Sequence, residues 1–318
     1  MRPATKRTAQ PIDLLPVDIT AYTGNTAIPY VMTLDSGRPG PHLLINALTH
    51  GNEVCGAHAI DYLFRNDVAP VRGKLSLSFA NVAAYAAFDA TNPGASRYLD
   101  EDFNRLWSTD VLDAPDRSRE HTRAKALRPL IEEVDHLLDL HSMQTPSPAL
   151  ALAGTTEKCR ATCAAIGVPA HIVVDAGHAA GVRMRDFAPF VDPANTRTAV
   201  LIECGQHWRA ESRDVAIDSA VRFLATFGCV SKTWLAPRLT STPADQRTIS
   251  VTDAVTVQTR NFQFLDDYQG LEVIPRAGTA IGRDENRDVV TPYDDCVLIM
   301  PTRHTKPGQT AVRFGRYL

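Results

Sequence analysis

The sequence predicts an α/β protein, in which helices cover both faces of a mostly parallel sheet, followed by a small all-β domain. Up to about residue 235, short apolar segments that suit buried strands alternate with segments whose apolar residues recur at helical spacing. Beyond that point the helical period disappears, and short alternating segments separated by Gly, Asp and Pro remain. We therefore expect an α/β domain over residues 1–235 and a small β domain over residues 236–318.

The strands of the first domain are expected to be short and either apolar throughout or alternating, as strands of a covered sheet are. They are predicted over residues 41–49, 73–81, 135–141, 170–177 and 198–205. Helices are predicted from an apolar face between them, beginning with Val54, Ala57, Ile60 and Leu63. Further helices are predicted over residues 116–134, 155–167 and 211–228. Pro129 should kink or delay the first of these, Gly167 should end the second, and Ser212 should cap the third.

The second domain is expected to follow a linker over residues 235–247, which is rich in Pro, Ser and Thr. Short alternating segments then occupy residues 248–259, 271–283, 294–301 and 310–318. No helical period survives among them, so this part is predicted to be all-β.

Composition excludes several classes of partner. The net charge of -3 provides no electrostatic footprint for nucleic acid or for an anionic membrane. The apolar runs are too short to span a bilayer, and the first residues lack the apolar region of a signal peptide. The 6 cysteines contain no C-x-x-C pair and suit reduced core thiols of a cytoplasmic protein. The sequence leaves a homo-oligomer open.

Polar side chains that can bind a metal or move a proton stand at the ends of three predicted strands. His50 and Glu53 follow the strand over residues 41–49. His141 and Glu203 stand at the ends of two later strands. Because ligands bind at the carboxyl ends of the strands in an open α/β sheet, we expect these four side chains to meet at one edge.

The chemistry of these residues suggests a role for each. Two histidines and one carboxylate leave a tetrahedral zinc with a free position, as hydrolysis by a zinc-activated water requires. Glu203 is then the natural base, because a carboxylate outside the metal shell must take the proton of the water. Asp139 could hold the imidazole of His141 in the right tautomer if both side chains project from one face.

Taken singly, these residues also have ordinary structural explanations. His50 and Glu53 could begin a helix, where a glutamate favours the helix dipole. His141 could be a strand-end histidine with satisfied hydrogen bonds. Glu203 is harder to explain in this way, because a carboxylate after an apolar strand risks burial without a partner. The histidines without such a setting are interpreted as structural or surface residues: His42, His58, His121, His171, His178, His207 and His304.

A second group of polar residues lies in the segment "SRYLDEDFNRLW" over residues 96–107. Such strings are often solvated loops, but here interleaved aromatic and aliphatic residues anchor the chain. An Asn104–Arg105 pair can bind a carboxylate, the arginine through its planar fork and the asparagine through its amide. A second arginine, Arg97, can polarise a carbonyl beside a metal.

The motifs "THGNE", "RYLDEDFNR", "DLH" and "IECG" occur in this order, and together they resemble the succinylglutamate desuccinylase and aspartoacylase family. The resemblance covers most of residues 40–210 and implies a zinc carboxypeptidase-like fold with a small C-terminal β domain that partly covers the active site. It also implies a role for seven residues. These are the ligands of a single zinc ion, His50, Glu53 and His141, the catalytic base and acid Glu203, the carbonyl-polarising Arg97, and the carboxylate-binding Asn104 and Arg105.

The sequence therefore predicts a zinc-dependent amidohydrolase that cleaves the amide bond of an N-acyl amino acid. The alternatives are a zinc carboxypeptidase acting on short peptides and a catalytically silent zinc-binding or regulatory protein of the same fold. The segment after His141 departs from the aspartoacylase pattern, so the acyl group and the amino acid stay open. Five residues are candidates for binding the acidic end of a substrate: Arg183, Arg185, Arg197, Tyr293 and His304.

Overall fold

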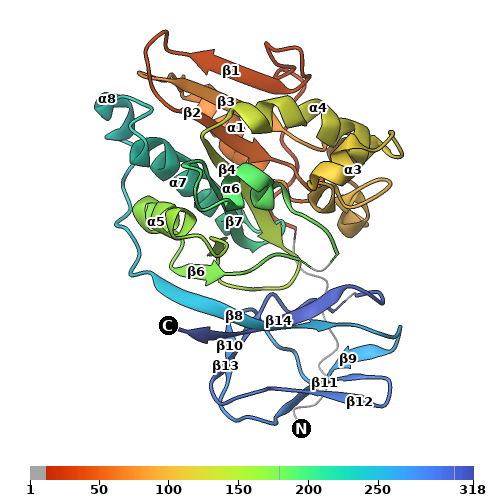
Figure 1. The fold of residues 1–318 in the computed structure, drawn as a ribbon. Coiled ribbons are helices and arrows are strands. Elements are labelled where there is room, and N and C mark those ends of the chain that lie inside the picture. The colour runs from red at the N-terminus through yellow and green to blue at the C-terminus, as the bar shows by residue number, and fades with distance from the viewer. Residues whose placement is uncertain (1–11, 179, 304) are drawn as a thin grey trace.

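The structure, a computed structural model, describes residues 12–178, 180–303 and 305–318, and its main element is an eleven-stranded mixed sheet (Figure 1). The strands lie in the order β1-β3-β2-β4-β7-β5-β6-β8-β14-β13-β10. Their bounds are β1 (Val31–Asp35), β2 (His42–Ala47), β3 (Lys74–Phe79), β4 (His136–Met143), β5 (Leu150–Leu152), β6 (His171–Val174), β7 (Thr198–Gln206), β8 (Arg247–Thr256), β10 (Glu272–Ile274), β13 (Cys296–Ile299) and β14 (Thr310–Tyr317).

The centre of the sheet is parallel, as the sequence predicts. β2 pairs in parallel with β3 on one side and with β4 on the other, and β4 pairs in parallel with β7. Consecutive residues of β2 pack on opposite faces of the sheet, since Leu44 and Ile45 belong to different hydrophobic clusters. This explains why the predicted strand over residues 41–49 is apolar without alternation. Strand β1, which is antiparallel to β3, and strand β5, which is antiparallel to β7 and parallel to β6, were not predicted.

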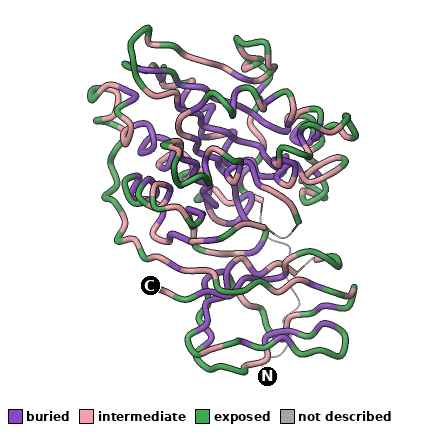
Figure 2. The backbone as a smooth tube through the Cα atoms, viewed as in Figure 1, coloured by how far each residue is buried: buried purple, intermediate pink, exposed green. Residues whose placement is uncertain are grey.

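Helices cover both faces of this part of the sheet (Figure 1). One hydrophobic cluster unites residues of α1 and α7 with the sheet, and the other unites residues of α4 and α6 with it. Figure 2 shows the buried backbone concentrated between these layers. The helices are α1 (Cys55–Arg65), α2 (Val82–Ala86), α3 (Thr109–Asp113), α4 (Arg119–Glu133), α5 (Glu157–Ile166), α6 (Ala188–Val191), α7 (Ala210–Thr226) and α8 (Lys232–Leu235), and the 3₁₀ turns are η1 (Pro93–Arg97), η2 (Phe103–Arg105) and η3 (Met184–Asp186).

The helix ends agree with the sequence in part. Gly167 follows α5 with a φ of 76°, a left-handed conformation that glycine adopts without strain. Pro129 lies inside α4, which begins ten residues earlier at Arg119 behind the capping side chain of Ser118. The prediction of Ser212 as the cap of α7 is wrong. The helix begins at Ala210, and the buried Ser212 hydroxyl donates to the carbonyl of Arg209 at 2.7 Å.

The C-terminal strands continue the main sheet and also form a second one. β8 pairs in parallel with β6, and β14, β13 and β10 then follow in antiparallel order. A small antiparallel sheet, β12-β11-β9, lies beside them. Its strands are β9 (Phe262–Phe264), β11 (Ala280–Asp284) and β12 (Arg287–Val290). As predicted, this part is all-β.

The cysteines and the helices also bear on the class of protein. All 6 cysteines are free and buried, in agreement with the prediction of core thiols. Within the described residues, no helix combines the length and the apolar character needed to cross a bilayer.

Candidate metal centre and active site

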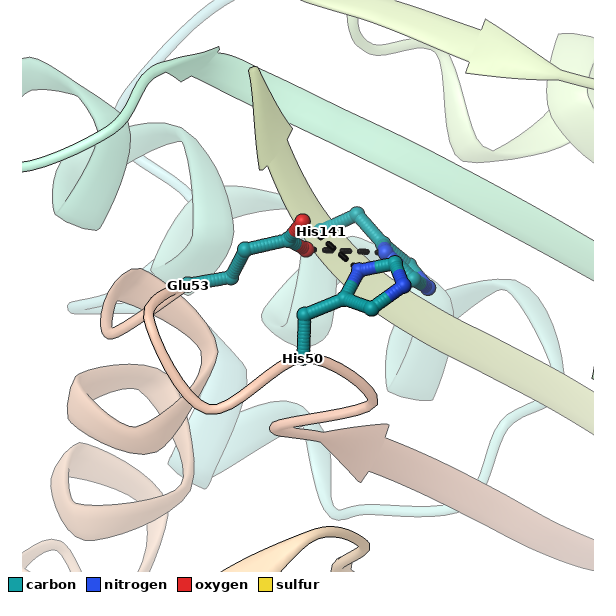
Figure 3. Close-up of side chains that lie close together, drawn as sticks. All are labelled: His50, Glu53 and His141. Carbon is teal, nitrogen blue, oxygen red and sulfur yellow. Dashed lines mark hydrogen bonds and ion pairs between the residues drawn. The ribbon is translucent and has the colours of Figure 1, made fainter. Parts of the chain in front are cut away.

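The three predicted metal ligands meet at the carboxyl ends of the neighbouring strands β2 and β4 (Figure 3). His50 Nδ1 lies 2.7 Å from Glu53 Oε1, and His141 Nδ1 lies 2.8 Å from Glu53 Oε2. One ligand atom from each residue lies within 4.8 Å of the others, and all three residues are buried. Two imidazoles and a carboxylate that converge in this way fit a zinc ion, and they leave a coordination position for water or substrate.

The turn between the first two ligands depends on a glycine. A side chain at Gly51 would approach the backbone of Ala84 and Tyr85 to 2.3–2.4 Å, so only glycine fits there. The amide of Gly51 also donates to the carbonyl of Arg97 at 3.1 Å. The glycine of the "THGNE" motif therefore connects the turn that carries His50 and Glu53 to the segment over residues 96–107, which we call the arginine segment.

Asp139 holds His141, as the sequence suggests. Its Oδ2 lies 2.8 Å from His141 Nε2, and its Oδ1 accepts hydrogen bonds from Asn46 Nδ2 at 2.8 Å and from Thr49 Oγ1 at 2.9 Å. Burial would raise the pKa of Asp139, but His141 and these hydrogen bonds bring it below its ordinary value. The ionised aspartate fixes the ring so that Nδ1 faces Glu53.

Asp102 holds His50 in the same manner, and sequence reasoning missed it. Asp102 Oδ1 lies 3.0 Å from His50 Nε2, and its other oxygen accepts from Arg97 at 3.1 Å. Each imidazole of the candidate metal site therefore has an aspartate at its second nitrogen. Asp102 stands among three consecutive acidic residues in the sequence. In the structure it precedes a 3₁₀ turn and accepts from the amide of Asn104, a contact that leaves no periodic pattern in the sequence.

Glu203 lies opposite His141 in the register of β4 and β7. It is buried, and its Oε2 has no hydrogen-bond partner among the described residues. Burial and the nearby negative charge of Glu53 raise the pKa of Glu203 to about 8. A carboxyl group with a raised pKa beside a metal site can both accept and return a proton near neutral pH.

The arginine segment lies beside these groups and is tied to helix α4. Arg97 Nη2 lies 2.8 Å from His50 Nε2, which places the guanidinium next to the metal site. The amides of Leu99 and Asp100 donate to the carboxylate of Glu120 at 2.7 and 3.1 Å. Burial and the neighbouring arginines lower the pKa of Arg105 to about 10, although Asp102 opposes this shift.

Asn104 is only partly available to a ligand. Its Oδ1 accepts a hydrogen bond from the amide of Met184 at 2.9 Å. The amide nitrogen Nδ2 therefore remains as the group that can donate to a carboxylate.

The seven residues to which the resemblance assigns a role, together with Asp102, line one cavity of about 480 Å³. Met300, Pro301, Thr302 and Arg313 of the C-terminal strands and loops complete its wall. A cavity of this size suits a small molecule.

The structure separates the five candidates for binding an acidic end. Arg183 lines the cavity, and Asp175 and Asp186 hold its guanidinium. Arg185 is buried outside the cavity wall, where it donates to the carbonyls of Ala153 and Ala199. The remaining candidates divide simply: Arg197 binds the carbonyl of Glu132, Tyr293 binds Thr252, and His304 lies outside the described residues.

Two of the histidines that we interpreted as structural or surface residues, His178 and His207, line the cavity. His178 lies in the loop after β6, and His207 follows β7 beyond a β-bulge. Sequence spacing does not reveal where such irregular segments direct their side chains. The role of His207 was easier to suspect from the sequence than that of His178, because His207 closely follows Glu203.

Comparisons with known proteins match the chain to one family and to several curated relatives. The model of the succinylglutamate desuccinylase/aspartoacylase catalytic domain matches residues 39–225, which is more than half of the chain. An N-acyl-aromatic-L-amino acid amidohydrolase (carboxylate-forming) of Rattus norvegicus is 29% identical over 116 residues, or 34% of this chain and 35% of that protein. The Homo sapiens protein of the same description is 35% identical over 103 residues, or 30% of this chain and 31% of its own. The chain thus spans about a third of the curated relatives it matches.

Solved structures share the fold at low sequence identity. A succinylglutamate desuccinylase from Vibrio parahaemolyticus has a TM-score of 0.65 and 16% identity, with 91% of this chain and 86% of that chain covered. Murine aminoacylase 3 has a TM-score of 0.61 and 18% identity, with 88% and 96% covered. The fold, the family motifs and the matched catalytic domain lead to one conclusion: the chain belongs to the succinylglutamate desuccinylase/aspartoacylase family.

Proposed function

We propose that the protein is a zinc-dependent amidohydrolase that cleaves the amide bond of an N-acyl amino acid and releases a carboxylate and an amino acid. The observation that carries this proposal is the convergence of His50, Glu53 and His141 beside Glu203, a buried carboxyl group with one oxygen that has no partner among the described residues. Membership of the family supports the reaction. The curated relatives are themselves described as amidohydrolases of N-acyl amino acids.

The residues around the cavity divide the work as follows. A zinc ion held by His50, Glu53 and His141 would lower the pKa of a bound water to about 7 and polarise the amide carbonyl. Glu203 takes the proton of the attacking water and later gives it to the leaving nitrogen. Arg97 donates to the carbonyl oxygen as negative charge develops there.

The substrate is held at its free carboxylate. Arg105 presents a planar fork to this group, and Asn104 adds the donors of its amide nitrogen. The buried environment of Arg105 strengthens such an ion pair, because little water competes with it. The free thiols favour a cytoplasmic location, and the partner we propose is a small molecule rather than nucleic acid or a membrane.

Two alternatives remain distinguishable from this proposal. A carboxypeptidase would use the same groups on peptides, and it would prefer substrates with several residues before the scissile bond. A catalytically silent protein would bind zinc without turnover. One cavity contains the proposed ligands together with Glu203, Arg97 and Arg105, and this argues against a protein without catalytic activity.

The test combines a metal analysis with a substrate panel. The purified protein should contain about one zinc ion per chain, and His50→Ala and His141→Ala should lose it. His136→Ala, at the other end of β4, is the matched control and should retain it. N-acetyl, N-succinyl and longer N-acyl amino acids should be hydrolysed, each far better than its carboxamide, because the amide leaves Arg105 unpaired. Equal kcat/KM for acid and carboxamide would refute the role of Arg105, and absence of zinc would refute the metal site.

A further inference from the structure

We propose that Ser142 and His207 are positioning residues that hold Glu53 in place for the metal. This inference rests on the proposed function, because it assigns a task within the same metal site. It concerns two residues that line the cavity and to which the reaction outlined above gives no role.

A short chain of contacts connects the three residues. The amide of Ser142, the residue after His141, donates to Glu53 Oε2 at 3.2 Å. The hydroxyl oxygen of Ser142 lies 2.7 Å from His207 Nδ1. Both Ser142 and His207 are buried, with 4% and 2% of their surface exposed. Each contact is therefore shielded from competing water.

Glu53 depends on this support more than the two histidines do. Asp102 and Asp139 fix the two imidazoles. The oxygens of Glu53, in contrast, face the Nδ1 atoms of His50 and His141, which are the atoms that would bind a metal. Among the described residues, the contacts of the carboxylate that do not involve a histidine are the Ser142 amide and Arg97 Nη1 at 3.5 Å. The orientation of a metal-ligating carboxylate is set by such outer partners.

The chain after Glu203 is built to bring His207 to Ser142. The pairs His141↔Glu203 and Met143↔Gln206 show one extra residue in β7, a β-bulge. Gly205, within the bulge, has a φ of 117°. Bulges next to active sites redirect side chains. Here the amide of His207 donates to the carbonyl of Met143 at 2.7 Å, which fixes the two strand ends together.

Trp208, the residue after His207, anchors the segment that carries Glu53. Trp208 has a φ of 65°, a left-handed conformation that is strained for a bulky residue. Its indole nitrogen donates to the carbonyl of Asn52, the residue before Glu53, at 3.0 Å. The segment 206–208 thus contacts both parts of the chain that carry metal ligands, and the strained conformation serves this contact.

A nucleophilic role for the same pair is less consistent with the structure. A serine 2.7 Å from an imidazole could resemble an activated hydroxyl. However, burial lowers the pKa of His207 to about 4, which makes its imidazole a weak base. No carboxylate among the described residues hydrogen bonds to the ring to orient it. The pair therefore suits a fixed hydrogen bond rather than proton transfer.

The test measures zinc affinity rather than turnover. We expect Ser142→Ala and His207→Gln to weaken zinc binding by about 10- to 100-fold in a chelator competition at fixed pH. Ser142→Thr keeps the hydroxyl and should restore affinity close to wild type. The double variant Ser142→Ala/His207→Gln should lose little more zinc affinity than either single variant, because both substitutions break the same contact between Ser142 and His207. The zinc-dependent rise in Tm should shrink in parallel.

A second histidine–hydroxyl pair on the same two strands provides the control. His136 Nδ1 on β4 lies 2.8 Å from Thr198 Oγ1 on β7, at the end of the strands remote from the metal site. His136→Gln should lower the Tm without changing zinc affinity. Wild-type affinity in both Ser142→Ala and His207→Gln would overturn the inference, as would an equal loss in His136→Gln. If the wild-type protein itself bound no zinc, the proposed function would fail instead.

Discussion

Glu203 and Asp139 are buried carboxyl groups of one site, and their surroundings move their pKa values in opposite directions. Asp139 accepts hydrogen bonds from two side chains and faces His141, which lowers its pKa. Burial and the negative charge of Glu53 raise the pKa of Glu203 to about 8, and its Oε2 has no hydrogen-bond partner among the described residues. Asp139 is thus suited to a permanent charge and Glu203 to proton exchange.

The substitution Glu203→Gln tests this contrast. Glu203→Gln keeps the shape of the side chain but cannot take up a proton. We expect the variant to bind zinc and to fold, while kcat falls by more than the roughly 10²–10⁴-fold of a single acid–base contribution, because Glu203 serves in two proton transfers. Steady-state kinetics beside a zinc analysis measure both effects. A variant with a near wild-type rate would show that another group is the base.

At this scale, the sequence reveals the residues whose position follows from the ends of regular strands. His50, Glu53, His141, Glu203 and Asp139 meet as expected, because the carboxyl ends of β2, β4 and β7 are adjacent. Asp102 and His207 were missed. A 3₁₀ turn places Asp102, and a β-bulge places His207. Neither feature leaves a periodic pattern in the sequence.

Helix α4 positions the arginine segment through its first turn. Glu120 has 0% of its surface exposed, yet its carboxylate is fully partnered. It accepts hydrogen bonds from the amides of Leu99, Asp100 and Glu101 and from Asn81 Nδ2, at 2.7–3.4 Å. This single side chain organises the loop between Arg97 and Arg105.

We therefore expect Glu120→Gln to harm substrate binding from a distance. The new amide group would direct a donor at backbone amides that also donate, and the variant should lose about 1–3 kcal/mol of unfolding free energy. KM should rise more than kcat falls, and zinc should be retained, since the metal ligands lie on other segments. Urea unfolding and kinetics measure these effects. Glu133→Gln, at the exposed end of the same helix, is the matched control. It should change neither the free energy of unfolding nor the kinetic constants.

At the scale of elements, the long periodic segments were the predictable ones. Strands β2, β3, β4, β6 and β7 and helices α1, α4, α5 and α7 occur where the sequence places them. The three-residue strand β5 was not predicted, because so short a segment carries too little pattern. The cap of α7 was misplaced because Ser212 uses its hydroxyl within the first turn rather than before it.

The pairing of β6 with β8 makes one sheet of the two parts of the molecule. Arg313 of β14 reinforces the connection, with its Nε 3.2 Å from Asp175, the residue after β6. The cavity also draws its wall from both parts. The hydrophobic pattern of the sequence shows the change at residue 235 but not this pairing, because strand order across a linker is a tertiary property.

This continuity predicts one cooperative unfolding transition. All 3 tryptophans precede residue 235, and Cys296 is the one cysteine after it, fully buried in β13. In a urea titration, tryptophan fluorescence and alkylation of Cys296 should report the same midpoint. Cys55, in α1, serves as the control thiol of the first part. Alkylation of Cys296 well before the fluorescence change would contradict the prediction and indicate two independent units.

The position of β14 has a consequence for the order of folding. β14 is the last strand in the sequence, yet it lies inside the sheet, between β8 and β13. β13 and β10 reach the rest of the sheet only through it. Pairings between distant segments form late, because loop closure costs entropy before contacts compensate for it. The wall contributed by Met300 and Arg313 is therefore completed late, and a folding chain could gather its proposed metal ligands before it has a finished compartment for a substrate.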